Sequence, residues 1–202
     1  KAAKNCFVPL TIGGGITKTS QVRDLLNVGA DKVCVNTTAH LNPNFISEVA
    51  GIYGSQFITI SVDSRNVDGQ NKAFVKNGTI DTGLSTKDFV KRSVELGAGE
   101  IIIHSIDRDG SKLGYDLDLI KEIRKVTSVP LIASGGVGRF QHLVDAVKVG
   151  GCNGVAAGNI FQHTELSTIA AKSFMKRAGI PIRIDSSVKY ENYQFDLWDR
   201  PI

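Results

Sequence analysis

Residues 8–16 read VPLTIGGGI, and residues 129–138 read VPLIASGGVG. The likeness continues beyond each stretch at the same offset of 121 residues. After the first stretch come an apolar helical pattern and then the segment Val33–Thr37, and after the second come a similar pattern and then Val155–Gly158. The chain therefore contains an internal repeat, and this repeat is the main clue to its fold.

Short apolar runs alternate along the chain with stretches whose apolar residues recur at helical spacing. The runs are nearly continuous in apolar residues, which is typical of parallel strands covered on both faces. We expect six strands, over Phe7–Ile12, Val33–Asn36, Phe57–Asp63, Ile101–Ile106, Val129–Ala133 and Gly154–Ala157. We expect six helices, over Gln21–Val28, Pro43–Ile52, Thr86–Leu96, Leu117–Val126, Phe140–Val149 and Glu165–Ala178. The pattern predicts six βα units in a row.

The offset of the repeat bears on how these units are arranged. It spans four βα units, as expected for a (β/α)8 TIM barrel made of two half-barrel repeats. We expect this chain to hold the third to eighth units of such a barrel and to lack the first two. Residues 1–184 would form this partial barrel, and residues 185–202 a polar, aromatic and irregular extension. An open sheet of six units is the alternative.

A long segment separates the third expected strand from the helix that follows it. Residues 64–83 are rich in Asn, Asp, Gly and Lys. Within it, Ala73–Val75 and Gly78–Ile80 are expected to form a small hairpin. Because the segment follows the carboxyl end of a strand, it lies where barrel enzymes carry functional loops.

Composition and charge argue against several classes of protein. The 202 residues carry a formal net charge of +4, the basic residues are scattered, and no nucleic-acid-binding motif is present. With neither a signal peptide nor an apolar run that could cross a bilayer, we expect a cytoplasmic protein. Cys6, Cys34 and Cys152 form no CxxC pair and are expected to be reduced thiols. The histidines share no metal-ligand spacing, so we expect neither a metal nor another cofactor.

Acidic residues follow two of the expected strands. Asp63 ends an apolar run, where burial tunes a carboxylate toward a neutral pKa and suits it to general acid or base catalysis. A capping role is the alternative. Asp107–Gly110 places two acids around an arginine, with carboxylates that can contact polyol hydroxyls, and a salt-bridged turn is its alternative. His104 precedes this turn and either belongs to the core or points into the site.

Glycine-rich turns supply the sharper pattern. Gly13–Gly15 and Gly135–Gly136 each follow a strand and precede a helix. Glycine lets backbone N–H groups approach an anion closely and aims the helix N-terminus at it. Asn36-Thr37 and Gly158-Asn159 follow the next strand of each copy. The repeat therefore predicts two phosphate sites with Asp63 between them, and close packing of strand on helix is the alternative.

The same repeat predicts a partner for Asp63. That partner falls on the first strand of the barrel, which we do not expect this chain to contain. A second acid there would complete an acid/base pair. We therefore expect the 202 residues to be inactive on their own.

Five stretches carry a resemblance to a known family: PLTIGGGI, GADKVCVNT, GSQFITISVDSRNV, GAGEIIIHSIDRDGSKLGYD and VPLIASGGVG. Together they closely resemble the cyclase subunit of imidazole glycerol phosphate synthase, from histidine biosynthesis, collinearly from Phe7 to Arg183. The resemblance implies a (β/α)8 barrel that binds a bis-phosphorylated formimino-carboxamide ribonucleotide. It also implies attack by ammonia from a glutaminase partner, giving imidazole glycerol phosphate and an aminoimidazole carboxamide ribotide.

The resemblance assigns roles to individual residues. Asp63 matches one of the family's two catalytic aspartates, and the other lies on the first strand. One phosphate site matches Gly14, Gly15, Asn36 and Thr37; the other matches Gly135, Gly136, Gly158 and Asn159. Substrate contacts are implied for Asp109 and Gly110, with Ser134 and His104 beside them. The polar surface where ammonia enters and the glutaminase docks matches Lys32, Gln56 and Glu100, which are expected to begin strands.

Three features depart from the family pattern. His104 stands where the family usually has Thr or Asn, and Gly158-Asn159 where it has Ala-Ser. Residues 185–202 extend past the usual end. Similar barrels occur in surface-glycan gene clusters, where they are associated with amidation of a nucleotide-linked sugar, again with a glutaminase partner. That paralogue is one alternative function, and a non-catalytic phosphate-binding scaffold is the other.

Overall fold

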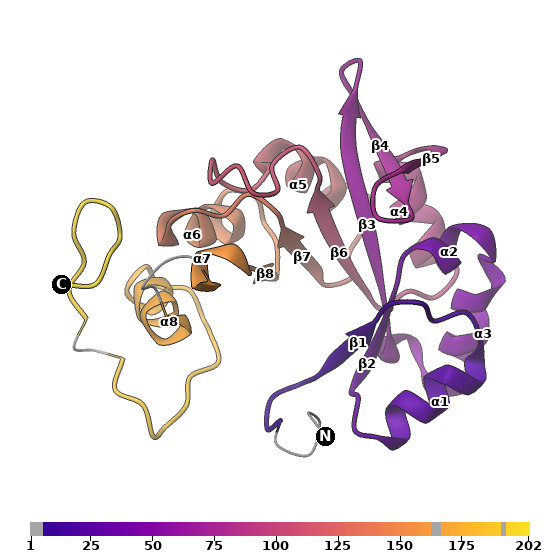
Figure 1. Ribbon diagram of the computed structural model, residues 1–202, viewed down its shortest axis with the longest axis horizontal. Helices are drawn as coiled ribbons and strands as arrows, with labels where there is room; N and C mark the ends of the chain where they lie inside the picture. The colour runs from indigo at the N-terminus through magenta and orange to yellow at the C-terminus, as the bar shows by residue number, and fades with distance from the viewer. Residues whose placement is uncertain (1–5, 163–166, 191–192) are drawn as a thin grey trace.

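Six parallel strands form the main path of one curved, eight-stranded sheet in a computed structural model of the chain, which describes residues 6–162, 167–190 and 193–202. The order across the sheet is β1-β2-β3-β6-β7-β8, so the strands follow one another in one direction. Figure 1 shows them along an arc with β1 and β8 at its two ends. The strands are β1 (Thr11–Gly13), β2 (Lys32–Val35), β3 (Ile58–Val67), β6 (Glu100–Ser105), β7 (Leu131–Ser134) and β8 (Gly154–Ala156).

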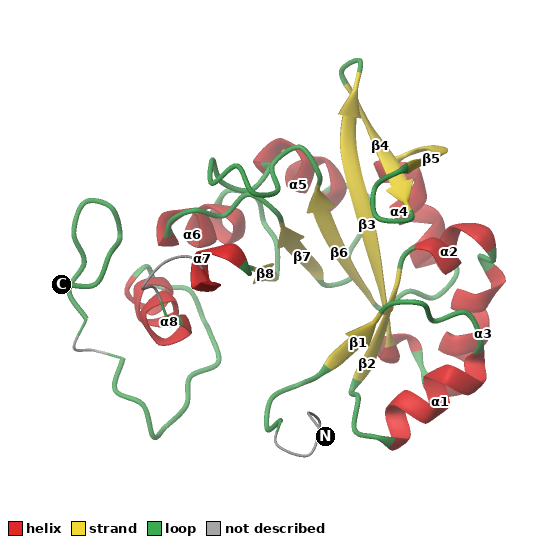
Figure 2. Ribbon diagram, viewed as in Figure 1, coloured by secondary structure: helices red, strands yellow, loops and turns green. Residues whose placement is uncertain are grey.

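Helices cover the outer, convex face of this arc (Figures 1 and 2). They are α1 (Thr19–Asn27), α2 (Thr37–Leu41), α3 (Asn44–Tyr53), η2 (Ser55–Phe57), α4 (Thr86–Glu95), α5 (Leu117–Arg124), α6 (Phe140–Lys148), α7 (Asn159–Gln162) and α8 (Thr168–Arg177). A doubly wound sheet would reverse its strand order and carry helices on both faces. The uniform order and the curvature instead confirm an α/β fold that forms part of a (β/α)8 barrel.

The core lies between the sheet and these helices. Along β6, Ile101 and Ile103 are buried against the helices, while Glu100, Ile102 and His104 alternate with them and lie on the concave face. The period of two follows from the pleat of a strand. The helices contribute large, fully buried side chains to the same core, among them Phe45, Ile46, Leu119, Ile120, Ile123 and Phe140. The concave face carries both apolar and polar side chains, and the polar ones near the carboxyl ends of the strands form the candidate site.

The internal repeat is visible in the structure. Helix α1 spans residues 19–27 and α6 spans residues 140–148, so both ends are 121 residues apart. Gly14 and Gly15 have φ of +107° and +69°, and Gly135 and Gly136 have +91° and +97°. The two glycine-rich turns thus share left-handed backbone conformations that side chains rarely adopt.

The third strand continues beyond the expected boundary at Asp63, and that boundary was wrong. β3 runs on to Val67 and turns back through Asp68 and Gly69, both with positive φ, into β4 (Gln70–Val75). β5 (Ile80–Ser85) then pairs with β4, which confirms the place of the expected hairpin and lengthens it. Figure 1 shows β3 and β4 projecting beyond the carboxyl ends of the other strands.

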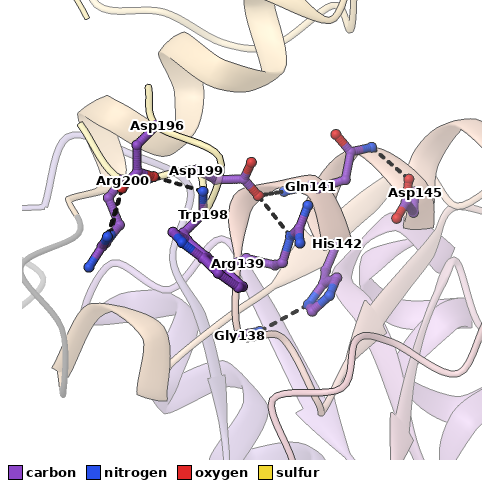
Figure 3. Close-up of polar contacts among 9 residues, drawn as sticks. All are labelled: Gly138, Arg139, Gln141, His142, Asp145, Asp196, Trp198, Asp199 and Arg200. Carbon is purple, nitrogen blue, oxygen red and sulfur yellow. Dashed lines mark hydrogen bonds and ion pairs between the residues drawn. The ribbon is translucent and has the colours of Figure 1, made fainter. Parts of the chain in front are cut away.

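The C-terminal segment packs against α6 and α8 through aromatic side chains. The ring centroid of Phe195 lies 6.0 Å from that of Phe140 and 5.1 Å from that of Phe174, in edge-on arrangements. Near its end, Asp199 Oδ2 accepts hydrogen bonds from the backbone N–H of Gln141 (2.8 Å) and from Arg139 Nε (3.1 Å) (Figure 3). Because α6 has no side-chain cap of its own, Asp199 satisfies an N–H group at its start.

Other element boundaries shift by a few residues. β1 begins at Thr11 rather than Phe7, and Phe7 and Val8 are exposed. The short helices α2 and α7 follow β2 and β8 directly and were not expected. The last expected helix begins at Thr168, while Glu165, where its start was predicted, lies outside the described residues.

Candidate active site on the concave face

Three side chains form a row across neighbouring strands at their carboxyl ends. Asp63 of β3 is the register partner of His104 of β6, and His104 is the register partner of Ser134 of β7. All three alternate with buried core residues, so they lie on the concave face. Adjacent strands are about 4.8 Å apart, so these side chains are immediate neighbours. The carboxyl ends of barrel strands are where active sites are built.

A first hollow of about 760 Å³ opens on one side of this row. Its lining includes Asp63 and every residue predicted for the first phosphate site: Gly14, Gly15, Asn36 and Thr37. A Cβ atom added to Gly14 or Gly15 would meet no atom within 4 Å. The space above this turn is therefore open to a ligand that approaches the backbone closely.

The far wall of the first hollow is tied to the β4–β5 turn. The backbone N–H of Lys76 donates to Thr37 Oγ1 at 3.1 Å, and Asn77 lines the hollow. Asn36 Nδ2 donates to the carbonyl oxygens of Ser61 (3.1 Å) and Phe74 (3.4 Å). The amide of Asn36 thus braces the hollow, and its orientation is set by β3 and β4.

A second hollow of about 280 Å³ opens on the other side of the row. The predicted residues that line it are Asp109, Gly110, Ser134, Gly135, Gly136, Gly158 and Asn159. Its glycine turn is closely packed, unlike that of the first hollow. A Cβ on Gly136 would lie 2.3 Å from the Gly114 carbonyl oxygen, and one on Gly135 would lie 2.7 Å from that of Ser105. The close packing expected as the alternative therefore describes this turn, and ligand binding there stays a prediction.

The two acids around Arg108 separate in the structure. Asp107 Oδ2 accepts a hydrogen bond from the backbone N–H of Asn66 at 2.7 Å, so it ties the turn to the end of β3. Asp109 lines the second hollow instead. Asp109 therefore stays the candidate for contact with a ligand, whereas Asp107 holds the backbone at the end of β3 rather than forming the expected salt bridge.

The carboxyl group of Asp63 has an altered acidity. Burial raises its pKa above the ordinary value of 3.8, and the nearby charge of His104 opposes this rise. Among the described residues, no hydrogen bond to this carboxyl group is found. A half-buried acid whose pKa is raised by burial is a candidate for proton transfer.

His104 lies between the two hollows. Its Nδ1 atom is 3.2 Å from Ser134 Oγ, within hydrogen-bonding distance, and its Nε2 atom is 3.9 Å from Asp109 Oδ2. With its side chain 29% exposed, the ring is reachable from the concave face. The structure therefore excludes a purely core position for this histidine.

A second polar group lies at the opposite, amino end of the strands. Lys32 Nζ of β2 pairs with Glu100 Oε2 of β6 at 2.6 Å, across the intervening strand. Thr59 of that strand donates to Glu100 Oε1 at 2.9 Å. Gln56 was expected to begin a strand beside this pair, and that placement was wrong. It belongs to η2, and its side-chain amide donates to the Tyr53 carbonyl at 3.4 Å.

Some lining residues escaped the sequence reasoning. Ser61 lies two residues before Asp63 on the same face of β3, and the period of two identifies it. Asn77 and Lys112 line the first and second hollows, and both have positive φ. The Asn77-Gly78 dipeptide is typical of such a turn, whereas the residue type of Lys112 gave no indication of it.

The described part of the chain contains neither a metal-binding cluster of side chains nor a helix that could span a membrane. Residues 6–162, 167–190 and 193–202 hold no group of three or more His, Cys, Asp or Glu side chains arranged to bind a metal ion. Within the same residues, no helix has the length and apolar character needed to span a membrane. His163, one of the four histidines, lies outside them.

Comparisons with known proteins agree with this geometry. The family described as "Histidine biosynthesis protein" matches residues 1–167. The chain belongs to this family. A relative from Vibrio vulnificus (strain YJ016), "Putative imidazole glycerol phosphate synthase subunit hisF2", is 47% identical over 201 residues, which cover 99% of this chain and 74% of the relative. The family resemblance seen in the sequence is thereby confirmed.

Membership of the histidine biosynthesis protein family indicates the general type of function. It supports a role like that of a cyclase subunit in this family.

Proposed function

We propose that the protein is an ammonia-using cyclase and lyase. Its substrate would be a bis-phosphorylated formimino-carboxamide ribonucleotide, converted to imidazole glycerol phosphate and an aminoimidazole carboxamide ribotide. The observation that carries the proposal is the row Asp63–His104–Ser134, flanked by two glycine-lined hollows. A substrate with a phosphate at each end requires an anion site on either side of the reacting atoms.

The phosphate roles follow from the backbone of each turn. Gly14 and Gly15 present an open turn before α1, and Gly135 and Gly136 present the equivalent turn before α6. Backbone N–H groups at such turns are good partners for phosphate oxygens. Asn36 with Thr37, and Gly158 with Asn159, complete the two linings.

Ammonia is proposed to enter from the amino ends of the strands. The ion pair of Lys32 with Glu100 spans this end, and both side chains are partly buried. A glutaminase partner docked on that face would deliver ammonia to the concave side without releasing it to water. Gln56, exposed on η2, is then a candidate for contact with this partner rather than for the entry itself.

Asp63 is proposed as one of two acid/base groups. The second acid is expected on a strand that precedes β1, at the position that the half-barrel repeat pairs with Asp63. On this view the 202 residues alone do not turn substrate over. A search of the coding sequence for an aspartate at that position tests the prediction directly, and any other residue there counts against it.

The decisive experiment measures turnover of the formimino ribonucleotide by the complete gene product with ammonium salt as nitrogen source. We expect turnover that Asp63→Asn lowers by about 10²–10⁴-fold. Asp118→Asn, on the first turn of α5, is the matched control and should leave the rate unchanged. A folded wild-type protein that consumes no substrate would reject the cyclase assignment.

A second candidate function is amidation of a nucleotide-linked sugar, supplied with ammonia in the same way. It is favoured by His104 and by Gly158-Asn159, which line or adjoin the site where the family usually has other residues. The location of the gene distinguishes the two candidates. A position among surface-glycan genes favours amidation, and one among histidine genes favours the cyclase.

A further inference from the structure

The turn between β4 and β5 carries an Asn-Gly dipeptide at the edge of the first hollow. Asn77 lines this hollow and is exposed. Lys76, Asn77 and Gly78 have φ of +51°, +58° and +73°, so three left-handed residues follow one another. Within the described residues, no hydrogen bond involves the side-chain amide of Asn77 or the N–H group of Gly78. The two groups are therefore free to react with each other.

Glycine is required at position 78 by the fold itself. Its positive φ is one that side chains rarely adopt, and a Cβ atom there would lie 2.9 Å from Cδ1 of Ile106. The residue after Asn77 is thus the one whose backbone nitrogen is least shielded, because it carries no side chain. Asparagine is a thermolabile residue, and an unshielded nitrogen directly after it favours attack on its amide.

We infer that Asn77 is a site of spontaneous modification, where the amide is converted to a carboxylate at the edge of the first hollow. The backbone nitrogen of Gly78 loses its proton and forms a bond to Cγ of Asn77, while the Cγ–Nδ2 bond breaks and ammonia leaves. Water then opens the five-membered imide at one of its two carbonyl carbons. The products are aspartate and its isomer, in which the main chain runs through Cβ and Cγ. One water is taken up and one ammonia is released, with no oxidation or reduction.

Ring closure requires the backbone between Asn77 and Gly78 to rotate. The turn is closed by Thr79, whose N–H group donates to the Val75 carbonyl at 3.1 Å and whose hydroxyl donates to the Lys76 carbonyl at 2.6 Å. Thr79 is exposed, and hydrogen bonds at exposed loop tips open at a small fraction of the free energy of global unfolding. The turn therefore reaches the reactive conformation while the sheet stays folded.

The chain contains the same dipeptide a second time, in a protected setting. Asn153 Oδ1 accepts hydrogen bonds from Arg124 Nη1 at 2.9 Å and from the Leu131 N–H group at 3.1 Å. Gly154 begins β8 and is held by the sheet. Rotation there would break these bonds and disturb a strand. Asn153 therefore serves as an internal control with the same local sequence.

The modification changes the charge around the first hollow. Among the described residues that line it, Asp63 is acidic and none is lysine, arginine or histidine. A carboxylate at position 77 has no positive charge on that wall to offset it, so it repels an anion bound above Gly14 and Gly15. This consequence rests on the proposed function, which places a phosphate there, whereas the chemistry at Asn77 does not.

Mass spectrometry of the complete protein tests the chemistry. Folded protein is kept in warm, mildly alkaline buffer and sampled over time, and trypsin at lower pH then releases residues 77–87 as one peptide. We expect Asn77 to be converted at least about tenfold faster than Asn153 in folded protein, and both at similar rates in denaturant. Asn77→Gln, which could close only a six-membered ring, should stay unmodified. Conversion of Asn77 no faster than that of Asn153 would overturn the inference.

Binding of inorganic phosphate tests the consequence for the hollow. Asn77→Asp reproduces the charged product, and Asn77→Gln is the matched neutral variant. In NMR titrations of the complete protein, we expect Asn77→Asp to weaken binding at the first hollow by about threefold to tenfold, with the second hollow unchanged. Equal affinities of the two variants would refute the effect on the hollow. Absence of phosphate binding by the wild type would refute the phosphate site of the proposed function instead, and the mass measurement decides the modification by itself.

Discussion

Gln21 and His142 occupy equivalent positions 121 residues apart, and each accepts a hydrogen bond from the backbone N–H four residues earlier. Gln21 Oε1 accepts from Thr17 at 2.9 Å, and His142 Nδ1 accepts from Gly138 at 3.2 Å. Each bond holds the chain between a glycine-rich turn and its helix. The two half-barrels therefore make the same contact with different side chains, and of the two only His142 can take up a proton.

The titration of His142 leads to a prediction about pH and stability. Burial, and next Arg139, lower the pKa of His142 below its ordinary value of 6.5, while Asp145 and Asp199 oppose the shift. A depressed pKa contributes stability that is present above pH 6.5 and is lost as pH falls through the value in the folded state. Urea unfolding at a series of pH values should show this loss.

His142→Gln copies the first half-barrel and should reduce the pH dependence. Glutamine accepts the same N–H group without taking up a proton, as Gln21 does. Asn153→Gln, beyond α6, serves to report the general effect of a substitution on unfolding. If His142→Gln lost as much stability at acid pH as the wild type, protonation of His142 would not be the cause of that loss.

Removal of Asp199 should destabilise α6. Its carboxylate accepts from the Gln141 N–H group and from Arg139, and the side chain is 9% exposed. Asp199→Ala is expected to lower the free energy of unfolding by about 1 kcal/mol, the usual cost of a lost helix cap. Ser187→Ala, which alters a contact confined to the same C-terminal segment, is the control in a denaturant titration. Equal effects of the two would contradict the capping role.

Asp63→Asn should stabilise the fold while it abolishes proton transfer. Because burial raises the pKa of Asp63, its contribution to stability is full below pH 3.8 and is lost as pH rises through the folded-state value. At pH 7 the amide should therefore give the more stable protein, with a difference that shrinks as the pH falls. Thermal unfolding across this range measures the difference. A variant less stable than the wild type at pH 7 would be evidence against a destabilising charge on buried Asp63.

The two glycine turns should respond differently to an added methyl group. Gly15→Ala places a Cβ in open space, so its cost to stability is the left-handed backbone, about 1–2 kcal/mol. Gly136→Ala forces a Cβ onto the Gly114 carbonyl oxygen and should be much more destabilising. Phosphate titrations followed by NMR should then show weaker binding at the first hollow in folded Gly15→Ala. Unchanged binding there would argue against a phosphate above Gly15.

Most of the fold could be predicted from local patterns in the sequence. The offset of 121 residues and the apolar periodicity predicted the order of strands and helices, because each unit depends on its own residues and on its neighbours. The prediction that Gln56 begins a strand was wrong because this residue belongs to a 3₁₀ turn that precedes β3. Asp68-Gly69, a recognised hairpin dipeptide, was available in the sequence and was overlooked.

The candidate site was predictable where residues follow strands and unpredictable where distant segments meet. Asp63 is fixed by its place on the concave face of β3, and the glycine turns by their place directly after β1 and β7. The contact of Asp199 with Gln141 joins residues 58 positions apart through an irregular segment, and no local rule indicates it. The positive φ of Lys112 likewise depends on loop contacts rather than on residue type, whereas Asn77-Gly78 is a recognised turn dipeptide.

Each hollow is built from its own part of the sheet, the first from β1 to β3 with the β4–β5 turn and the second from the segments that follow β6 to β8. A ligand anchored in one hollow has its other end confined near the second, so the second contact forms at a high effective concentration. Under the proposed function, compounds with only one terminal phosphate would lose this advantage, however well they fit. The spacing between the two turns would then select the length of the ligand.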